Sequence, residues 1–150
     1  SHVDVTLSVI GLVISVHVLG MYAFSPLVGA LSDKLGRIRV IQIGVAILIS
    51  AAIIAGLSPA MNPVSLGIGL FLLGLGWSCT LIAGSTLLSE SVSVEMKPSS
   101  QGASDLVMNL MGAVGGAASG VIIGFLSFGW LCFFIGALVF LLGAWSLKVK

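Results

Sequence analysis

Five long apolar stretches, separated by short polar breaks, constrain this chain more than any other feature of its sequence. They run from Leu7 to Leu31, Val40 to Leu57, Val64 to Ser89, Leu106 to Leu126 and Gly129 to Leu147. At about 1.5 Å of rise per residue, each can cross a hydrocarbon core of roughly 30 Å, and we expect the fourth helix to cover about 104–126. The pattern predicts an all-α, polytopic membrane bundle of five transmembrane helices, which form one partial domain over residues 1–150.

Composition supports a membrane protein. Hydrophobic residues make up 58% of the chain, charged residues only 7%, and the mean hydropathy is +1.24, which a soluble surface would not tolerate. The six basic residues are too dispersed for a nucleic-acid-binding patch, so membrane lipid is the expected surrounding and nucleic acid is excluded as a partner.

The basic residues lie in alternate breaks. The first break holds Lys34, Arg37 and Arg39, the third holds Lys97, and the C-terminus holds Lys148 and Lys150, while the second and fourth breaks hold none. Five crossings place these three clusters on one side of the membrane. The positive-inside rule then predicts a cytoplasmic C-terminus and an N-terminus outside.

Few residues are suited to chemistry. Cys79 and Cys132 lie inside apolar stretches, where we expect free, buried thiols that pack as small hydrophobes. No nucleophile, base and orienting acid converge in the sequence, and no metal-ligand spacing is present. We therefore predict no catalytic residues, no metal, no cofactor and no enzymatic activity. Ser1 to Asp4 lack the basic region of a signal peptide, so we expect the first stretch to remain as a helix.

The break between the first two stretches carries the most specific pattern in the chain. A glycine is followed four residues later by an aspartate, then by a second glycine and basic residues, in the order Gly29, Asp33, Lys34, Gly36, Arg37 and Arg39. This pattern resembles the loop signature of the major facilitator superfamily (MFS) of transporters, which joins two membrane helices. Lys34 stands in place of a commoner arginine, and Ile38 in place of a second basic residue.

Elementary chemistry gives these positions a role. Gly29 allows helices to approach closely, Gly36 permits a turn conformation closed to most residues, and Asp33 supplies a carboxylate beside Lys34 and Arg37. The alternative is that these charges only fix the membrane topology. The spacing of the glycines and the aspartate favours the first interpretation.

The resemblance implies a place in a larger protein. The signature occurs once in each half of a twelve-helix transporter, after helix two and after helix eight. The basic C-terminus and the absence of an arginine from the third stretch favour helices eight to twelve, so we expect the partner to be a missing N-terminal half. The family's arrangement implies that the third helix lines the central cavity, the first and fourth contact the other half, and the second and fifth lie outside.

Candidate site residues lie on three of the helices. Trp77, Ser78 and Thr80 on the third helix can offer a solute a stacking surface and hydrogen bonds, although serine and threonine commonly bond to their own helix instead. His17 on the first helix, with Asp105 and Asn109 on the fourth, are candidate proton or polar sites. His17 can equally serve as a donor to a helix carbonyl. We expect Asp105 near the first turn of a helix capped by Ser99 or Ser100, where it can act simply as a dipole partner.

The fourth helix contains a glycine series at every fourth position: Gly112, Gly116, Gly120 and Gly124. Small residues at this spacing let helices pack closely in lipid, and structural packing is the expected role. A smooth contact of this kind would also suit two halves that rock against each other.

Glu90 ends the third helix on the side where the family places an acidic partner for the loop arginine. We expect Asp33, Arg37 and Glu90 to form a cluster that holds the cytoplasmic face closed. The alternative is a solvated surface pair of little consequence.

Together these features predict part of a secondary active transporter that moves a small-molecule substrate by alternating access. The resemblance places it in the plasma (inner) membrane. Efflux is preferred over uptake because the candidate cavity helix is largely apolar and uncharged. The alternative is a non-transporting membrane scaffold or assembly partner of five helices.

Overall fold

The computed structural model describes residues 2–58 and 63–146, and its regular structure over these ranges is entirely helical. The elements are α1 (His2–Tyr22), α2 (Ser25–Leu35), α3 (Arg37–Gly56), α4 (Pro63–Glu90), a short 3₁₀ turn η1 (Val94–Met96), α5 (Lys97–Phe125) and α6 (Phe128–Ser146). Five spans are long and apolar enough to cross a membrane, with α1 and α2 sharing the first. The predicted all-α membrane bundle with five spans is confirmed.

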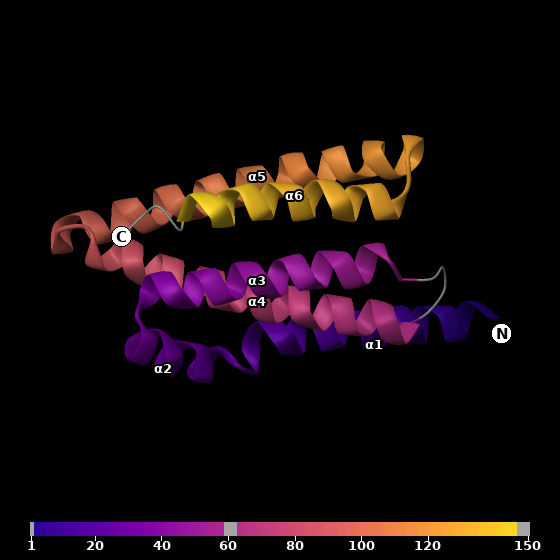
Figure 1. The fold of residues 1–150 in the computed structure, drawn as a ribbon, viewed down its shortest axis with the longest axis horizontal. Coiled ribbons are helices and arrows are strands. Elements are labelled where there is room, and N and C mark those ends of the chain that lie inside the picture. The colour runs from indigo at the N-terminus through magenta and orange to yellow at the C-terminus, as the bar shows by residue number, and fades with distance from the viewer. Residues whose placement is uncertain (1, 59–62, 147–150) are drawn as a thin grey trace.

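The spans run back and forth along one long axis (Figure 1). The junction of α2 and α3 and the turn η1 before α5 lie at the same end of the bundle, and the connection from α5 to α6 lies at the other. The basic residues of the first and third breaks therefore share an end. Lys148 and Lys150 lie outside the described residues.

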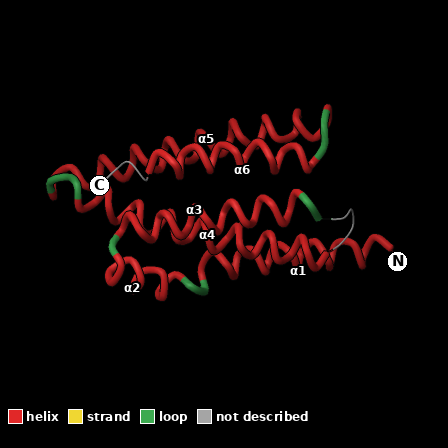
Figure 2. The backbone as a smooth tube through the Cα atoms, in the orientation of Figure 1, coloured by secondary structure: helices red, strands yellow, loops and turns green. Residues whose placement is uncertain are grey.

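The first span is broken, whereas the sequence predicted one continuous helix from Leu7 to Leu31. α1 ends at Tyr22, α2 begins at Ser25, and the membrane-length stretch extends to Leu35 (Figure 2). Pro26 has no backbone N–H to donate to the preceding turn, so the helix cannot continue unbroken. The Ser25 hydroxyl instead donates to the Met21 carbonyl at 3.1 Å.

α5 begins well before the predicted start near residue 104. Its first residue is Lys97, with Pro98 in the first turn, where proline suits a helix start. The prediction that Asp105 lies near the first turn is therefore wrong. This residue lies in the third turn, away from the helix N-terminus where the dipole favours a carboxylate. The predicted serine cap is also wrong, because Met96 holds the cap position and no side chain caps the helix.

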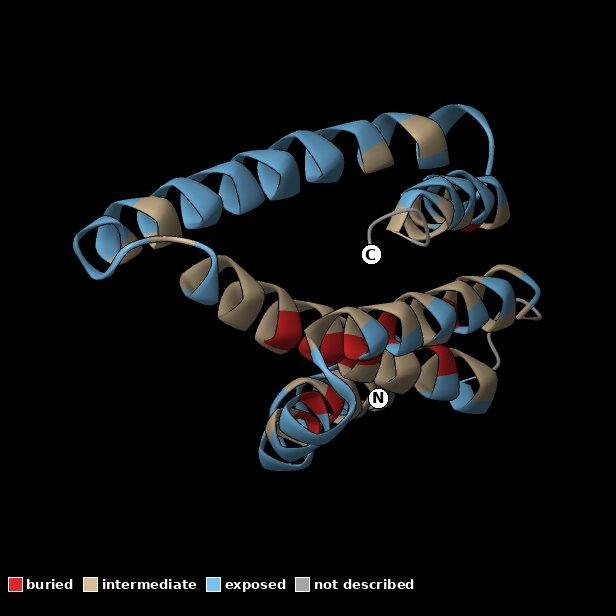
Figure 3. Ribbon diagram, turned by 60° about the vertical axis from the view of Figure 1, so that its left-hand side comes forward, coloured by how far each residue is buried: buried red, intermediate tan, exposed pale blue. Residues whose placement is uncertain are grey.

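α4 is the central helix of the packed part of the molecule. It contacts α3 extensively and α1 to a lesser degree, and α6 packs against α3. The core of buried residues is small and comprises Val28, Val40, Cys79 and Ala83. α5 stands apart and is exposed along nearly its whole length (Figure 3).

Glycine makes the close helix crossings possible. An added Cβ at Gly20 would lie 2.5 Å from the Phe71 carbonyl oxygen, and one at Gly74 would meet the His17 carbonyl oxygen, so α1 and α4 cross backbone against backbone. Gly44 and Gly76 make the equivalent crossing of α3 and α4, where each added Cβ would lie 3.0 Å from the other's carbonyl oxygen. These contacts supply the dispersion energy that holds helices together in lipid.

Candidate functional site

The loop between α2 and α3 turns at Gly36, whose φ of 92° and ψ of 152° are rarely adopted by residues with a side chain. The turn places Arg37 at the first position of α3. Asp33, near the end of α2, is then brought within reach of the Arg37 side chain.

Arg37 is the centre of a cluster of ion pairs. Its Nη1 lies 2.5 Å from Asp33 Oδ1, while Nη2 donates to Glu90 Oε1 at 2.8 Å and Nε to Glu90 Oε2 at 3.3 Å. A weaker bond of 3.4 Å joins Nη1 to the Ser32 hydroxyl, and Ser32 is buried. We call these four residues the Arg37 cluster. The structure thus brings together the three side chains that the sequence singled out and adds Ser32.

The Arg37 cluster ties three helices together at one end of the bundle. Asp33 comes from α2, Arg37 from α3 and Glu90 from the end of α4. The arginine side chain is only 20% exposed, whereas the carboxylates of Asp33 and Glu90 are 71% and 52% exposed. Water and salt can therefore reach the carboxylates, so the pairs can be exchanged or released without a large desolvation penalty.

The other residues of the loop signature make fewer contacts. Lys34 and Arg39 are exposed. An added Cβ at Gly29 would find no atom of the described residues within 4 Å, so the close helix approach expected there is not present. Gly29 instead leaves an open position on α2.

The three candidate cavity residues on α4 have different surroundings. Ser78 is buried, and its hydroxyl lies 3.4 Å from that of Ser25. Thr80 donates to the carbonyls of its own helix at Gly76 and Trp77 (3.1 and 3.0 Å), as the alternative interpretation anticipated. Trp77 is half-buried and meets the ring of Tyr22 edge-on, with 6.3 Å between ring centroids and 69° between planes.

Two of the three candidate polar residues, His17 and Asn109, form side-chain hydrogen bonds to backbone carbonyls. His17 Nδ1 lies 2.7 Å from the Leu70 carbonyl oxygen and so links α1 to α4, which is the structural role considered beside proton transfer. Asn109 donates from Nδ2 to the Asp105 backbone carbonyl at 2.7 Å, one turn away on the same helix. Both Asp105 and Asn109 are exposed.

The glycine series on α5 is open. An added Cβ would find no described atom within 4 Å at any of its members, Gly112, Gly116, Gly120 and Gly124. The close crossings within the described residues involve Gly20, Gly44, Gly74 and Gly76, which the sequence analysis did not single out. The available signal was the presence of a glycine inside a long apolar run, where a small residue lets two membrane helices approach closely.

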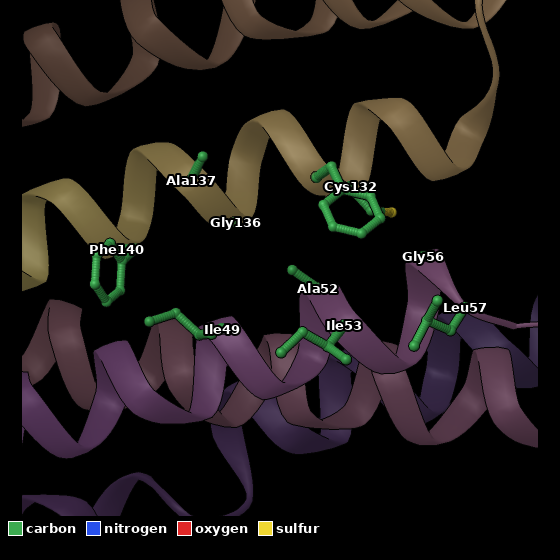
Figure 4. Close-up of a pocket in the computed structure, with 10 residues that line it drawn as sticks. Ile49, Ala52, Ile53, Gly56, Leu57, Cys132, Gly136, Ala137 and Phe140 are labelled. Carbon is green, nitrogen blue, oxygen red and sulfur yellow. The ribbon is translucent and has the colours of Figure 1, made fainter.

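A pocket of about 280 Å³ lies between α3 and α6 (Figure 4), and Trp77 is not among its lining residues. Its lining is apolar and includes Ile49, Ile53, Cys132 and Phe140. Cys132 and Cys79 are free and buried, as the sequence predicted. The lining offers a solute no charge and almost no hydrogen-bonding group, so the pocket adds nothing to the polar features of the candidate site.

The five membrane-length helices and the loop between α2 and α3 define a polytopic helical membrane protein. The sequence profile of the Major Facilitator Superfamily matches residues 1–150, and the chain belongs to this family. Two relatives from Bacillus subtilis (strain 168), the "Uncharacterized MFS-type transporter YddS" and the "Uncharacterized MFS-type transporter YdeG", are each 39% identical over 117 residues. That match covers 78% of this chain and 27% of each relative's length, so the chain spans about a quarter of the relatives it matches.

Proposed function

We propose that the chain is the C-terminal portion, helices eight to twelve, of a secondary active transporter that moves a small solute across the plasma membrane by alternating access. The observation that carries the proposal is the Arg37 cluster, formed by the family's signature loop at the shared end of three helices. Membership of the family and the short span relative to its relatives support a missing N-terminal half as the partner.

The cluster is suited to hold one of two states. Arg37 bridges two carboxylates that lie on different helices, and both carboxylates are accessible to water. Such a contact stabilises a closed cytoplasmic end but can dissociate when the halves rock, as alternating access requires. In this proposal the Arg37 cluster stabilises the state closed to the cytoplasm, and efflux is the favoured direction.

Exchanging the charges of Arg37 on α3 and Glu90 on α4 tests whether their ion pair is needed for transport. In the full-length transporter, Arg37→Glu and Glu90→Arg should each abolish most solute flux, because either change sets like charges against each other. The double exchange should restore part of the flux, because the α3–α4 pair forms again while Asp33 then faces a carboxylate at position 37. Lys34→Glu, which changes an exposed charge in the same loop, is the matched control and should leave flux largely intact. Continued loss in the double exchange, with normal amounts of protein in the membrane, would refute the pairing.

Alternating access itself calls for an exchange measurement. Purified full-length protein in liposomes should take up a labelled solute faster when the liposomes are preloaded with the same unlabelled solute. A panel of sugars, amino acids, organic cations and organic anions should reveal at least one exchanged compound. Absence of exchange for every member would overturn the proposed transport function.

A membrane scaffold is the second candidate, and the open glycine face of α5 is the observation that favours it. A scaffold would use this face to bind another integral protein and would show no solute exchange. The same liposome measurement separates the two functions.

A further inference from the structure

We propose that Tyr22 and Trp77 form a binding site for a lipophilic cation that carries aromatic rings. The inference rests on the proposed transport function and names the class of solute. It starts from the broken first span, which places the two rings together although they belong to different helices and lie more than fifty residues apart.

Both residues lie near the centres of their membrane-length spans. Tyr22 is the last residue of α1, close to the centre of the 29-residue span Leu7–Leu35. Trp77 lies at the centre of the span Pro63–Glu90. A helix interrupted at the midplane is the feature that transporters use to present groups to a solute. The break thus puts an aromatic pair at the depth where a solute passes.

The pair remains accessible. Tyr22 is 61% exposed within this chain, and Trp77 belongs to a face of α4 that it shares with Leu73 and Gly84 by helical spacing. Leu73 is 38% exposed, and an added Cβ at Gly84 would meet no described atom within 4 Å. The close backbone crossings with α1 and α3 use other faces of α4, through Gly74 and Gly76. Space is therefore available beside the two rings.

The side chains around Tyr22 and Trp77 indicate which class of solute the site would bind. A neutral apolar compound gains little by leaving lipid for an equally apolar protein surface, so the site must offer something that lipid does not. The electron-rich faces of tyrosine and tryptophan attract cations, and their edges and faces pair with other aromatic rings. The nearby hydroxyls of Ser25 and Ser78 contact each other, and Ser25 also donates to the Met21 carbonyl of α1, so they contribute little to an anion or a sugar.

The charge distribution of the described residues agrees with a cationic solute. The described lysines and arginines are Lys34, Arg37, Arg39 and Lys97, and they lie at the membrane-surface end of their helices. A cation at the midplane therefore meets no positive side chain of the described residues. An anion would meet no counter-charge from them at that depth, and a cation would meet no carboxylate of the described residues there, so the aromatic faces alone favour the cation.

The test uses tetraphenylphosphonium and the full-length protein in lipid nanodiscs. Radiolabelled tetraphenylphosphonium should bind saturably, and tetrabutylammonium, a lipophilic cation without aromatic rings, should compete at least about tenfold less well. This comparison needs no variant. Equal competition, or no saturable binding to the unaltered protein, would overturn the inference.

Variants assign the site. Trp77→Leu and Tyr22→Leu should each weaken binding of tetraphenylphosphonium by about tenfold, and Trp77→Phe should weaken it less because a ring is retained. Trp130→Leu is the matched control, because Trp130 is exposed and stacks among aromatic residues on α6. Loss of binding in Trp130→Leu equal to that in Trp77→Leu would refute the assignment.

The outcome is separable from that of the transport proposal. Exchange of another solute in liposomes, without specific binding of tetraphenylphosphonium, would overturn this site and leave alternating access intact. Specific binding that depends on Trp77 and Tyr22, without exchange of any solute, would support the site and overturn transport.

Discussion

Among the described glycines, Gly74 lies closest to the backbone of a neighbouring helix, so one added methyl group would clash there. In Gly74→Ala, the new Cβ would meet the backbone of α1 at His17 and lie 3.0 Å from the Met21 nitrogen. Backbone cannot move aside as a flexible side chain can, so α1 and α4 must separate, and we expect a loss of about 1–3 kcal/mol. Thermal denaturation of the purified full-length protein in detergent measures it. Gly84→Ala is the control, because its Cβ would enter open space; equal melting temperatures for the two variants would contradict this prediction.

His17 is a second residue whose role at this crossing can be measured. Its Nδ1 lies 2.7 Å from the Leu70 carbonyl oxygen, which a leucine side chain could not replace. We expect His17→Leu to lose about 1 kcal/mol of stability, a typical value for a hydrogen bond between membrane helices. His17→Gln, which keeps an N–H donor, should lose less and retain solute exchange. Abolished exchange in a stably folded His17→Gln protein would instead favour the proton-carrying role.

At the scale of the element, α5 is the span that makes the fewest contacts with the others, through α4 and α6. Its glycine face is open, and we expect the missing half of the transporter to cover it. Gly116→Leu in the full-length protein should therefore reduce solute exchange strongly, because the side chain would hold the two halves apart. Ala118→Leu, an enlargement about 200° around the same exposed helix, should have little effect. Matching effects of the two substitutions would show that the glycine face makes no close contact.

The elements also show what sequence can and cannot predict. The length of the apolar runs was sufficient for the five spans, because each must cover a hydrocarbon core of a set thickness. The break at Ala23–Phe24 was missed because hydropathy continues through Ser25 and Pro26, whereas the break depends on one missing backbone N–H. The pairing of Arg37 with Glu90 was predictable from the resemblance to the family, which places an acidic partner for the loop arginine at the end of that helix. The contact of Tyr22 with Trp77 was not, because it depends on the geometry of the break.

At the scale of the whole molecule, the described helices form one packed group, α1 to α4 with α6 against α3, and one helix that stands off. The Arg37 cluster joins α2, α3 and α4 at one end of the packed group, and the Gly20–Gly74 crossing joins α1 to α4 near the centres of their membrane-length spans. α2, which follows the break, carries Asp33 and is attached mainly through its contacts with α3 and α4. Release of the cluster would thus free α2, the segment that follows the break, while α1 stays in place.

The orientation of the molecule in the membrane gives the last prediction. If the basic breaks face the cytoplasm, the connection between α5 and α6 must face outward, because it lies at the opposite end of the bundle. In a full-length protein with no other reactive cysteine, a membrane-impermeant maleimide should label Ser127→Cys on intact cells. Ser91→Cys, beside Glu90, should be labelled only after the cells are permeabilised. Both positions are exposed, so access to the thiol does not distinguish them. The reverse pattern of labelling would place the Arg37 cluster outside and remove its proposed role in closing the cytoplasmic face.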